Sequence, residues 1–170
     1  MNSAGQAFID RSRAFLGSEY LPKIRSCLDE LPPDALWWRP NAASNSVGNL
    51  LLHLSGNLGQ WIVSGVGGEP DVRERQAEFD AEGGREAAEL LARLEATVAD
   101  ADRVLAGLDP GRLLEARVVQ GTDTTVLDAI YHVVEHFGMH TGQIAYITKM
   151  RTGEDLGFYD VEDGIARPTW

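Results

Sequence analysis

The 170-residue chain contains one cysteine, Cys27, and no apolar run long enough to cross a bilayer. A single thiol cannot form an intramolecular disulfide, so the fold does not depend on oxidising conditions. The first ten residues, MNSAGQAFID, lack both the basic and the apolar segment of a secretory signal. Together these absences predict a soluble, cytoplasmic protein.

Basic residues are scarce as well. The chain has 15 Lys and Arg against 26 Asp and Glu, which gives a net charge of −11. A field of that sign repels phosphate backbones and anionic lipid, so we expect neither nucleic acid nor a membrane as partner, but a small-molecule substrate. The hydrophobic content of 44% in 170 residues is enough for one core, and we expect a single domain over residues 1–170.

No segment alternates polar and apolar residues as a β-strand does, whereas apolar residues recur at helical spacing in four places. A short extended piece is expected after Asp109-Pro110-Gly111, before the last helix. We expect helices near residues 3–31, 46–66, 85–108 and 125–151, followed by a polar tail over 153–170. Because short polar segments join these helices, the pattern predicts an all-α fold, a four-helix bundle.

Three further features refine this expectation. Pro22 lacks a backbone donor and is expected to kink the first helix. The polar run through Gly83-Gly84 is expected to be a loop. The 85–108 helix carries an apolar seam typical of helix packing, and exposed members of it could support a homodimer. The seam consists of Ala87, Leu91, Leu94, Val98, Ala101, Leu105 and Leu108.

Two of the expected helices carry polar residues at identical offsets of zero, four, eight and eleven. On the 46–66 helix these are Asn49, His53, Asn57 and Gln60. On the 125–151 helix they are His132, His136, His140 and Gln143. Each set falls on one helix face. An unpaired buried polar group costs about 1–3 kcal/mol, so we expect the two stripes to face each other.

Three neutral imidazoles in one place are typical of a metal site. A His pair at i, i+4 spans one ion, and a His from a facing helix completes the set, which favours His136, His140 and His53 as ligands. Three His without Cys leave a position for water or substrate, as in catalytic sites. The residues expected to orient the ligands or contact a substrate are His132, Glu135, Asn49, Asn57, Gln60 and Gln143. The alternative is that these histidines lie on the surface or are hydrogen-bonded within the core.

A second motif overlaps the first. The segment from His132 to His136, HVVEH, matches the H-x-x-E-H pattern of inverzincin peptidases, in which two His bind zinc and Glu activates water. Such enzymes need a further acidic ligand and a substrate cleft. The peptidase interpretation also leaves His53 and His140 without a role, so we favour the three-His site.

Residues 132–144, HVVEHFGMHTGQI, resemble the fourth-helix signature of the DinB/YfiT-like family of metal-binding four-helix bundles. Residues 44–54, SNSVGNLLLHL, fit the second helix of that family. With YLPKI at 20–24 and LWWRP at 36–40, the resemblance covers nearly all of residues 1–152.

The resemblance implies one divalent metal ion, zinc, nickel or iron, held at the positions of His53, His136 and His140. Family members of known activity include thiol transferases and a maleylpyruvate isomerase that use a low-molecular-weight thiol such as mycothiol or bacillithiol. Many members carry a basic residue directly after the third His, where this chain has Thr141. A cation that could hold an anionic substrate is therefore missing at this position.

Together these patterns predict a metal-dependent S-transferase, isomerase or hydrolase in which a metal-bound thiol or water becomes the nucleophile and Glu135 acts as a base beside it. Cys27 is expected to be buried and inert. A non-catalytic bundle that is stabilised by metal, or senses it, is the alternative. A third hypothesis is an interaction protein that uses Trp37, Trp38 and Trp61, although large aromatics near a bundle core are usually packing anchors.

Overall fold

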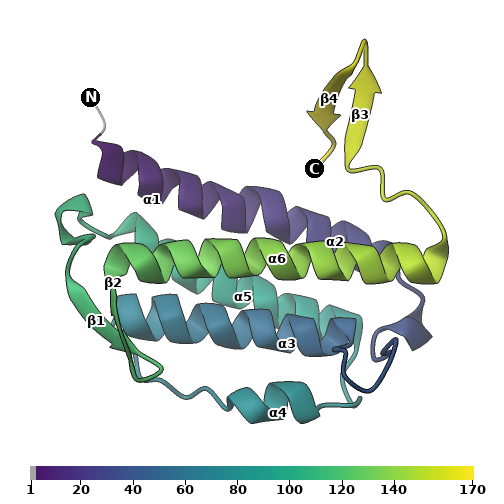
Figure 1. Cartoon of the computed structure of the whole chain (residues 1–170), viewed down its shortest axis with the longest axis horizontal. Coiled ribbons are helices and arrows are strands. Elements are labelled where there is room, and N and C mark those ends of the chain that lie inside the picture. The colour runs from purple at the N-terminus through teal and green to yellow at the C-terminus, as the bar shows by residue number, and fades with distance from the viewer. Residues whose placement is uncertain (1–2) are drawn as a thin grey trace.

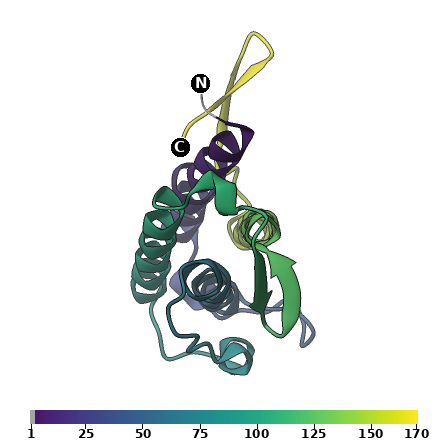
Figure 2. The same ribbon diagram turned by 90° about the vertical axis from the view of Figure 1, so that its left-hand side faces the viewer.

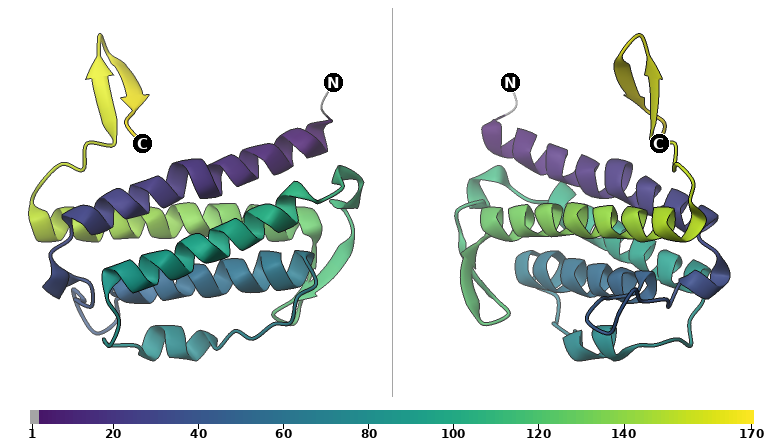
Figure 3. Two further views of the ribbon diagram at one scale, coloured as in Figure 1. Left: turned by 180° about the vertical axis from the view of Figure 1, so that it is seen from behind. Right: turned by 45° about the vertical axis from the view of Figure 1, so that its right-hand side comes forward.

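The computed structural model of the chain describes residues 3–170, which are mainly helical (Figure 1). Helix α6 (Val126–Thr152) is the longest element. It packs against α3 (Val47–Leu58) on one side and α2 (Leu21–Glu30) on the other, and α5 (Ala87–Ala106) contacts both α3 and α1 (Ala4–Ala14) from behind (Figures 1 and 3). Every helix in residues 3–170 is too short or too polar to span a bilayer.

The first helical segment runs without a break from α1 through a π-helical stretch, Phe15–Tyr20, into α2. The amide of Leu21 donates to the carbonyl of Leu16, five residues back, in the wider turn of a π-helix. Pro22 follows directly and has no N–H to donate. The distortion expected at this proline thus takes the form of a local π-helix just before it.

Helix α3 begins with a capping box. The hydroxyl of Ser46 accepts from the amide of Asn49, and the side-chain oxygen of Asn49 accepts from the amide of Ser46. The Asn49 amide nitrogen also donates to the carbonyls of Glu78 and Ala81. Asn49 therefore fixes the start of α3 and ties it to the segment beyond it. After Leu58 the helix continues as a π-helical stretch, Gly59–Val66.

The segment expected to be only a loop contains a short helix, α4 (Arg75–Asp80), which lies against α3 (Figure 1). The prediction of a continuous loop was therefore wrong here. Six residues are too few to show a helical period, and the helix depends on contacts with α3 rather than on its own sequence.

Two short hairpins are present. The first lies where a short extended piece was expected, whereas the second lies in the tail, where the expectation of no strand was wrong. Strands β1 (Ala116–Val119) and β2 (Thr122–Thr125) pair before α6, and β3 (Tyr159–Glu162) pairs with β4 (Ile165–Pro168) in the expected tail. Four-residue strands are too short for alternation to stand out. Both two-residue turns, Gln120-Gly121 and Asp163-Gly164, have positive φ angles. The Asp-Gly pair is a strong hairpin signal, although no hairpin was predicted there.

The two hairpins differ in their surroundings. The β1–β2 hairpin lies beside α6 and the Gly59–Val66 stretch (Figure 2), and Val119 at its turn is buried against Gly65. The β3–β4 hairpin stands away from the helices (Figures 1 and 3), and all eight of its strand residues are exposed. Only the first hairpin is therefore positioned to influence the centre of the molecule.

The core is made by the inner faces of the long helices. Of the apolar seam on α5, Leu94, Val98, Ala101 and Leu105 are buried within the chain itself. Cys27 is fully buried, as predicted, and burial raises the pKa of its thiol to about 11. The thiol therefore stays protonated and unreactive at neutral pH.

Candidate metal centre

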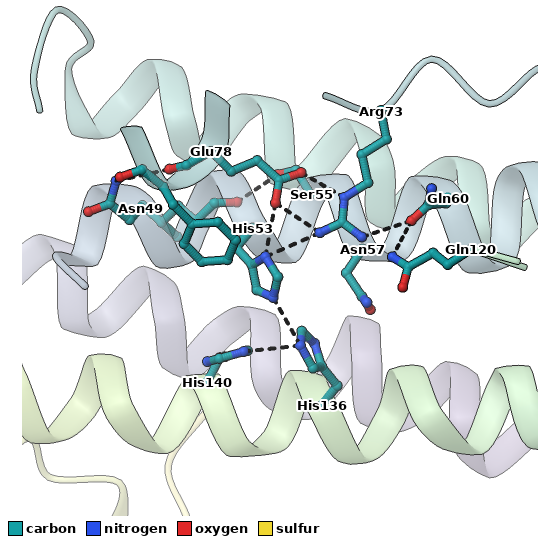
Figure 4. Close-up of polar contacts among 12 residues, drawn as sticks. Asn49, His53, Ser55, Asn57, Gln60, Arg73, Glu78, Gln120, His136 and His140 are labelled. Atoms are coloured by element: carbon teal, nitrogen blue, oxygen red, sulfur yellow. Dashed lines mark hydrogen bonds and ion pairs between the residues drawn. The ribbon is translucent and has the colours of Figure 1, made fainter. Parts of the chain in front are cut away.

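Histidines of α3 and α6 face each other, and three of them meet between the two helices (Figure 4). The two polar stripes face each other only in part, because Asn49 and Gln60 contact the segments around α4 instead. The Nε2 atom of His136 lies 3.0 Å from Nε2 of His53 and 3.1 Å from Nε2 of His140. One ring nitrogen from each residue lies within 4.8 Å of the other two. Nitrogens bound to a single zinc ion at about 2.0–2.1 Å are roughly 3.3 Å apart in a tetrahedron, so the cluster fits one ion.

On α6 the cluster is held by contacts inside one helix. His136 and His140 are one turn apart and therefore project from the same face. The Nδ1 atom of His140 lies 2.7 Å from the side-chain oxygen of Gln143. Because that oxygen can only accept, Nδ1 carries the proton and the Nε2 lone pair of His140 is directed at the cluster.

On α3 the ligand is held from another element. The Nδ1 atom of His53 lies 2.9 Å from Oε2 of Glu78, a residue of α4. The carboxylate can accept a hydrogen bond from the Nδ1–H group, and in that tautomer the Nε2 lone pair of His53 is free to bind a metal. Arg73 donates from Nε to Oε1 of Glu78 at 2.7 Å and from its terminal nitrogen to Oε2 at 2.8 Å. The terminal nitrogen of Arg73 also lies 3.1 Å from Nδ1 of His53, so the His53 ring contacts both members of the Arg73–Glu78 pair (Figure 4).

The Arg73–Glu78 pair is removed from water, since the two side chains are only 3% and 8% exposed. Burial alone would raise the pKa of Glu78, but hydrogen bonds and charge from Arg73 and His53 lower it overall. The carboxylate is therefore ionised at neutral pH and can hold the His53 proton.

Glu78 reaches this position because α3 has a glycine beneath it. A Cβ atom on Gly56 would lie 1.9 Å from Oε1 of Glu78, far inside contact distance. At Gly59, by contrast, a Cβ would meet only the methyl group of Thr97 at 3.8 Å. The missing side chain at Gly56 thus makes room for the Glu78 carboxylate, whereas Gly59, in the continuation of the same helix, does not contact it.

The histidines of α6 are in the neutral form that metal binding requires. Burial, together with the neighbouring imidazoles, lowers the pKa of His136 to about 3. Burial also lowers the pKa of His140 below its ordinary value. The Nδ1 atom of His136 is buried and has no hydrogen-bond partner among residues 3–170. Within the described residues, His136 is therefore the member of the cluster whose ring has no supporting hydrogen bond at Nδ1.

His132 lies one turn before this group but outside it. Its Nε2 is 3.4 Å from the side-chain nitrogen of Asn57, and its ring lies 4.2 Å from the ring of Trp61. Asn57 and Trp61 lie one and two turns after His53, in α3 and in the π-helical stretch that continues it. His132 and Asn57 therefore border the histidine cluster without joining it.

Two other predicted residues, Gln60 and Glu135, lie outside the histidine cluster. Gln60 bonds to Asp71, Arg73 and Gln120 and so ties the segment before α4 to the β1–β2 hairpin. Glu135 is exposed and makes no hydrogen bond or ion pair with the rest of the described chain.

The tryptophans and Thr141 have packing roles. The ring of Trp37 lies against Gly48, and its indole nitrogen donates to the carbonyl of Arg85. Trp61 is buried beside His132. The hydroxyl of Thr141 is buried and donates to the carbonyl of Phe137, so this position faces the core rather than the cluster.

The sequence analysis missed Glu78 and Arg73, the residues that hold His53. Both lie in a segment without a clear period, and an acidic residue in a chain with 26 of them is not distinctive. The Asn49 contacts to α4 could not be foreseen either. The position of Glu78 is marked by the lack of space for a Cβ atom at Gly56, and that lack of space is seen only in the three-dimensional structure.

Comparison with known proteins gives a family but no activity. No curated protein matches the chain. Residues 3–164 match the model of a family described as "Protein of unknown function (DUF1572)", which covers the helices, the histidine cluster and most of the second hairpin. The chain therefore belongs to the DUF1572 family.

Proposed function

We propose that this protein is a DinB/YfiT-like four-helix bundle that holds one divalent metal ion through His53, His136 and His140 and acts as a metal-dependent enzyme in the cytoplasm. The observation that carries the proposal is the convergence of three imidazole Nε2 atoms, with separations of 3.0 and 3.1 Å at His136. Four long helical segments around this cluster support the bundle.

The donor set suits zinc, nickel or iron, because imidazole binds each of these metals. When bound, the metal supplies a Lewis acid that lowers the pKa of a thiol or water in its open position and so provides a nucleophile near neutral pH. The chain orients the ligands: Glu78 fixes the His53 ring and Gln143 fixes the His140 ring. Asn57 and His132 are the polar groups available to orient a substrate at the cluster.

A thiol nucleophile would have to be a separate small molecule. The protein's own thiol, Cys27, is fully buried, and its pKa is raised to about 11. It packs against α6 near Thr148, on the core side of the helix. A low-molecular-weight thiol entering from solvent is therefore the cofactor we propose for a transferase or isomerase reaction.

The metal site is tested by elemental mass spectrometry of untagged protein and of four alanine variants. We expect one equivalent of metal, lost in His53→Ala, His136→Ala and His140→Ala and kept in His132→Ala. His132 is the matched control, since it lies on the same face of α6 as His136 and His140. Metal-free protein that takes up no zinc, nickel or iron at neutral pH would refute the site.

Catalysis is tested separately from metal binding. Metal-loaded protein is assayed with common cellular thiols and electrophiles, and turnover that disappears in His136→Ala supports the enzyme. A second candidate is a bundle that binds metal without turnover. The exposed position of Glu135 favours it, because among the described residues Glu78 is then the one carboxylate hydrogen-bonded to the cluster, and it is engaged by His53. Stoichiometric metal without any turnover would support that candidate.

A further inference from the structure

One side of α6 is exposed along almost its whole length. Ten of the 27 residues of α6 are buried, and a line of side chains on the opposite side faces solvent. We call this line the α6 stripe, and it consists of Tyr131, Glu135, Met139, Gly142, Tyr146, Lys149 and Met150. Its four large apolar side chains are between 48% and 67% exposed. Single exposed apolar residues are ordinary, but four on one line spanning roughly 28 Å mark an interaction surface.

The central part of the stripe, from Glu135 to Lys149, is nearly symmetric about Gly142. Met139 lies three residues before Gly142 and Tyr146 four residues after it. Glu135 lies seven residues before Gly142, and Lys149 lies seven after it. If two α6 helices cross antiparallel at Gly142, Glu135 faces the partner's Lys149, and Met139 and the partner's Tyr146 lie within one residue of facing each other. Acid then faces base, and apolar side chains face each other.

From this arrangement we infer that two copies of the chain associate through the α6 stripe, antiparallel, about a twofold axis at Gly142. Glu135 pairs with the partner's Lys149, and Met139 packs against the partner's Tyr146. The twofold axis repeats both contacts. A second copy is the occupant that the stripe fits, because the stripe is complementary to itself.

The charged residues of the stripe have little to hold them within their own chain. Glu135 forms no ion pair with any other residue of 3–170. The Nζ atom of Lys149 is 4.0 Å from Oδ1 of Asp155, an exposed residue, and an ion pair at that distance in water contributes little. Both side chains are therefore free to pair across the axis.

Gly142 is open to solvent, and a Cβ on it would meet no atom within 4 Å. The fold of the single chain therefore gives no reason for a glycine at this position. At the crossing point of two helices, the absent side chain lets the axes approach closely, since the interaxial distance depends on the side chains at the contact. The glycine thus lies where the proposed dimer needs one.

The other apolar seam of the chain does not compete with this surface. Leu94, Val98 and Leu105 on α5 are buried inside the chain and cannot pack against a partner. The α6 stripe also lies beside the histidine cluster, because His136 and His140 follow Glu135 and Met139 by one residue, roughly 100° around the helix. A partner on the stripe therefore stands next to the metal ligands without replacing them.

The test is the molar mass of the full chain in solution, measured by sedimentation velocity over a range of concentrations. We expect a mass twice that of the 18.6 kDa monomer. Glu135→Lys and Lys149→Glu each place like charges across the axis and should weaken association at least roughly tenfold. The double variant with both changes restores opposite charges and should restore the dimer.

Glu82→Lys is the control, because Glu82 is exposed, lies outside α6 and gives the same change in net charge as Glu135→Lys. It should leave the dimer intact. A second probe is Gly142→Trp, which should give a monomer that still binds one equivalent of metal. A wild-type monomer at all concentrations overturns the inference. So does a dimer that the single charge reversals leave unchanged, or a double variant that stays monomeric.

Discussion

The two helices that carry the histidines hold them in different ways. On α6, His136, His140 and Gln143 lie within two turns, so one helix sets their relative positions. On α3, His53 depends on Glu78, which is 25 residues further along the chain. The α6 half of the centre is local, and the α3 half is tertiary. The position of His53 can therefore be disturbed by a substitution outside the three histidines, whereas the α6 pair is held within its own helix.

The largest effect is expected at the buried ion pair of the α3 half. Glu78→Ala leaves the buried Arg73 guanidinium without its partner, which should lower the free energy of unfolding by about 3–5 kcal/mol. It also removes the acceptor of the His53 proton, so metal affinity should fall about 10–100-fold. Urea unfolding of metal-free protein and a metal titration measure the two effects.

The control for that variant is Glu74→Ala, an exposed carboxylate just before α4, which should change neither quantity. The paired change Arg73→Met with Glu78→Leu removes both charges together. It should recover most of the stability but not the metal affinity, because His53 still lacks its acceptor. Unchanged metal affinity in Glu78→Ala would show that the two halves are held equally well.

A smaller effect is expected at the seat of the carboxylate. Gly56→Ala pushes Glu78 away from His53 without altering either residue, and overpacking of this kind destabilises by about 1–3 kcal/mol. Metal affinity should fall in parallel. Gly59→Ala is the matched control on the same helix and should be neutral, since its new methyl group meets only Thr97 at 3.8 Å. Equal effects of the two alanines on metal affinity would contradict the role given to Gly56.

Acid should test the α6 half in the absence of metal. The pKa of His136 is about 3 in the folded chain and about 6.5 in the unfolded chain. Below about pH 6.5 the unfolded state binds the proton more readily, so the contribution of His136 to stability, complete above that pH, falls as pH drops toward 3. Urea midpoints of metal-free protein at pH 7.5 and 5 should therefore differ more in the wild type than in His136→Ala. Equal differences would argue against the buried, neutral imidazole.

The smallest effect is expected at Gln143. Its side chain is exposed, so water can replace the oxygen that accepts from His140. Metal affinity of Gln143→Ala, measured by the same titration, should fall less than about tenfold, and thus less than in Glu78→Ala. A larger loss than in Glu78→Ala would reverse the comparison between the two halves.

The sequence predicted the local part of this molecule well. The spacing of His136 and His140 on a long helix, with His53 on a second helix opposite, could be derived from periodicity and from the cost of burying polar groups. Periodicity could not locate α4 or either hairpin, because elements of four to six residues are shorter than the pattern that would identify them.

What the sequence could not provide is the support of His53. Glu78 and Arg73 matter because α4 folds back over Gly56, and that contact has no counterpart in residue spacing. The β3–β4 hairpin is a different case. Its Asp163-Gly164 turn is a hairpin signal that the sequence does contain, so this hairpin could have been predicted from local residues alone.

The chain separation within the cluster has a consequence for biosynthesis. His53 and His136 meet across 83 residues, and a growing chain emerges from the ribosome amino terminus first. Contacts between such distant residues form late, since loop closure must be offset before they contribute. No three-histidine site exists until α6 has been synthesised and has docked. A metal ion held by these three histidines would therefore bind the folded protein and would not serve as a template for its early folding.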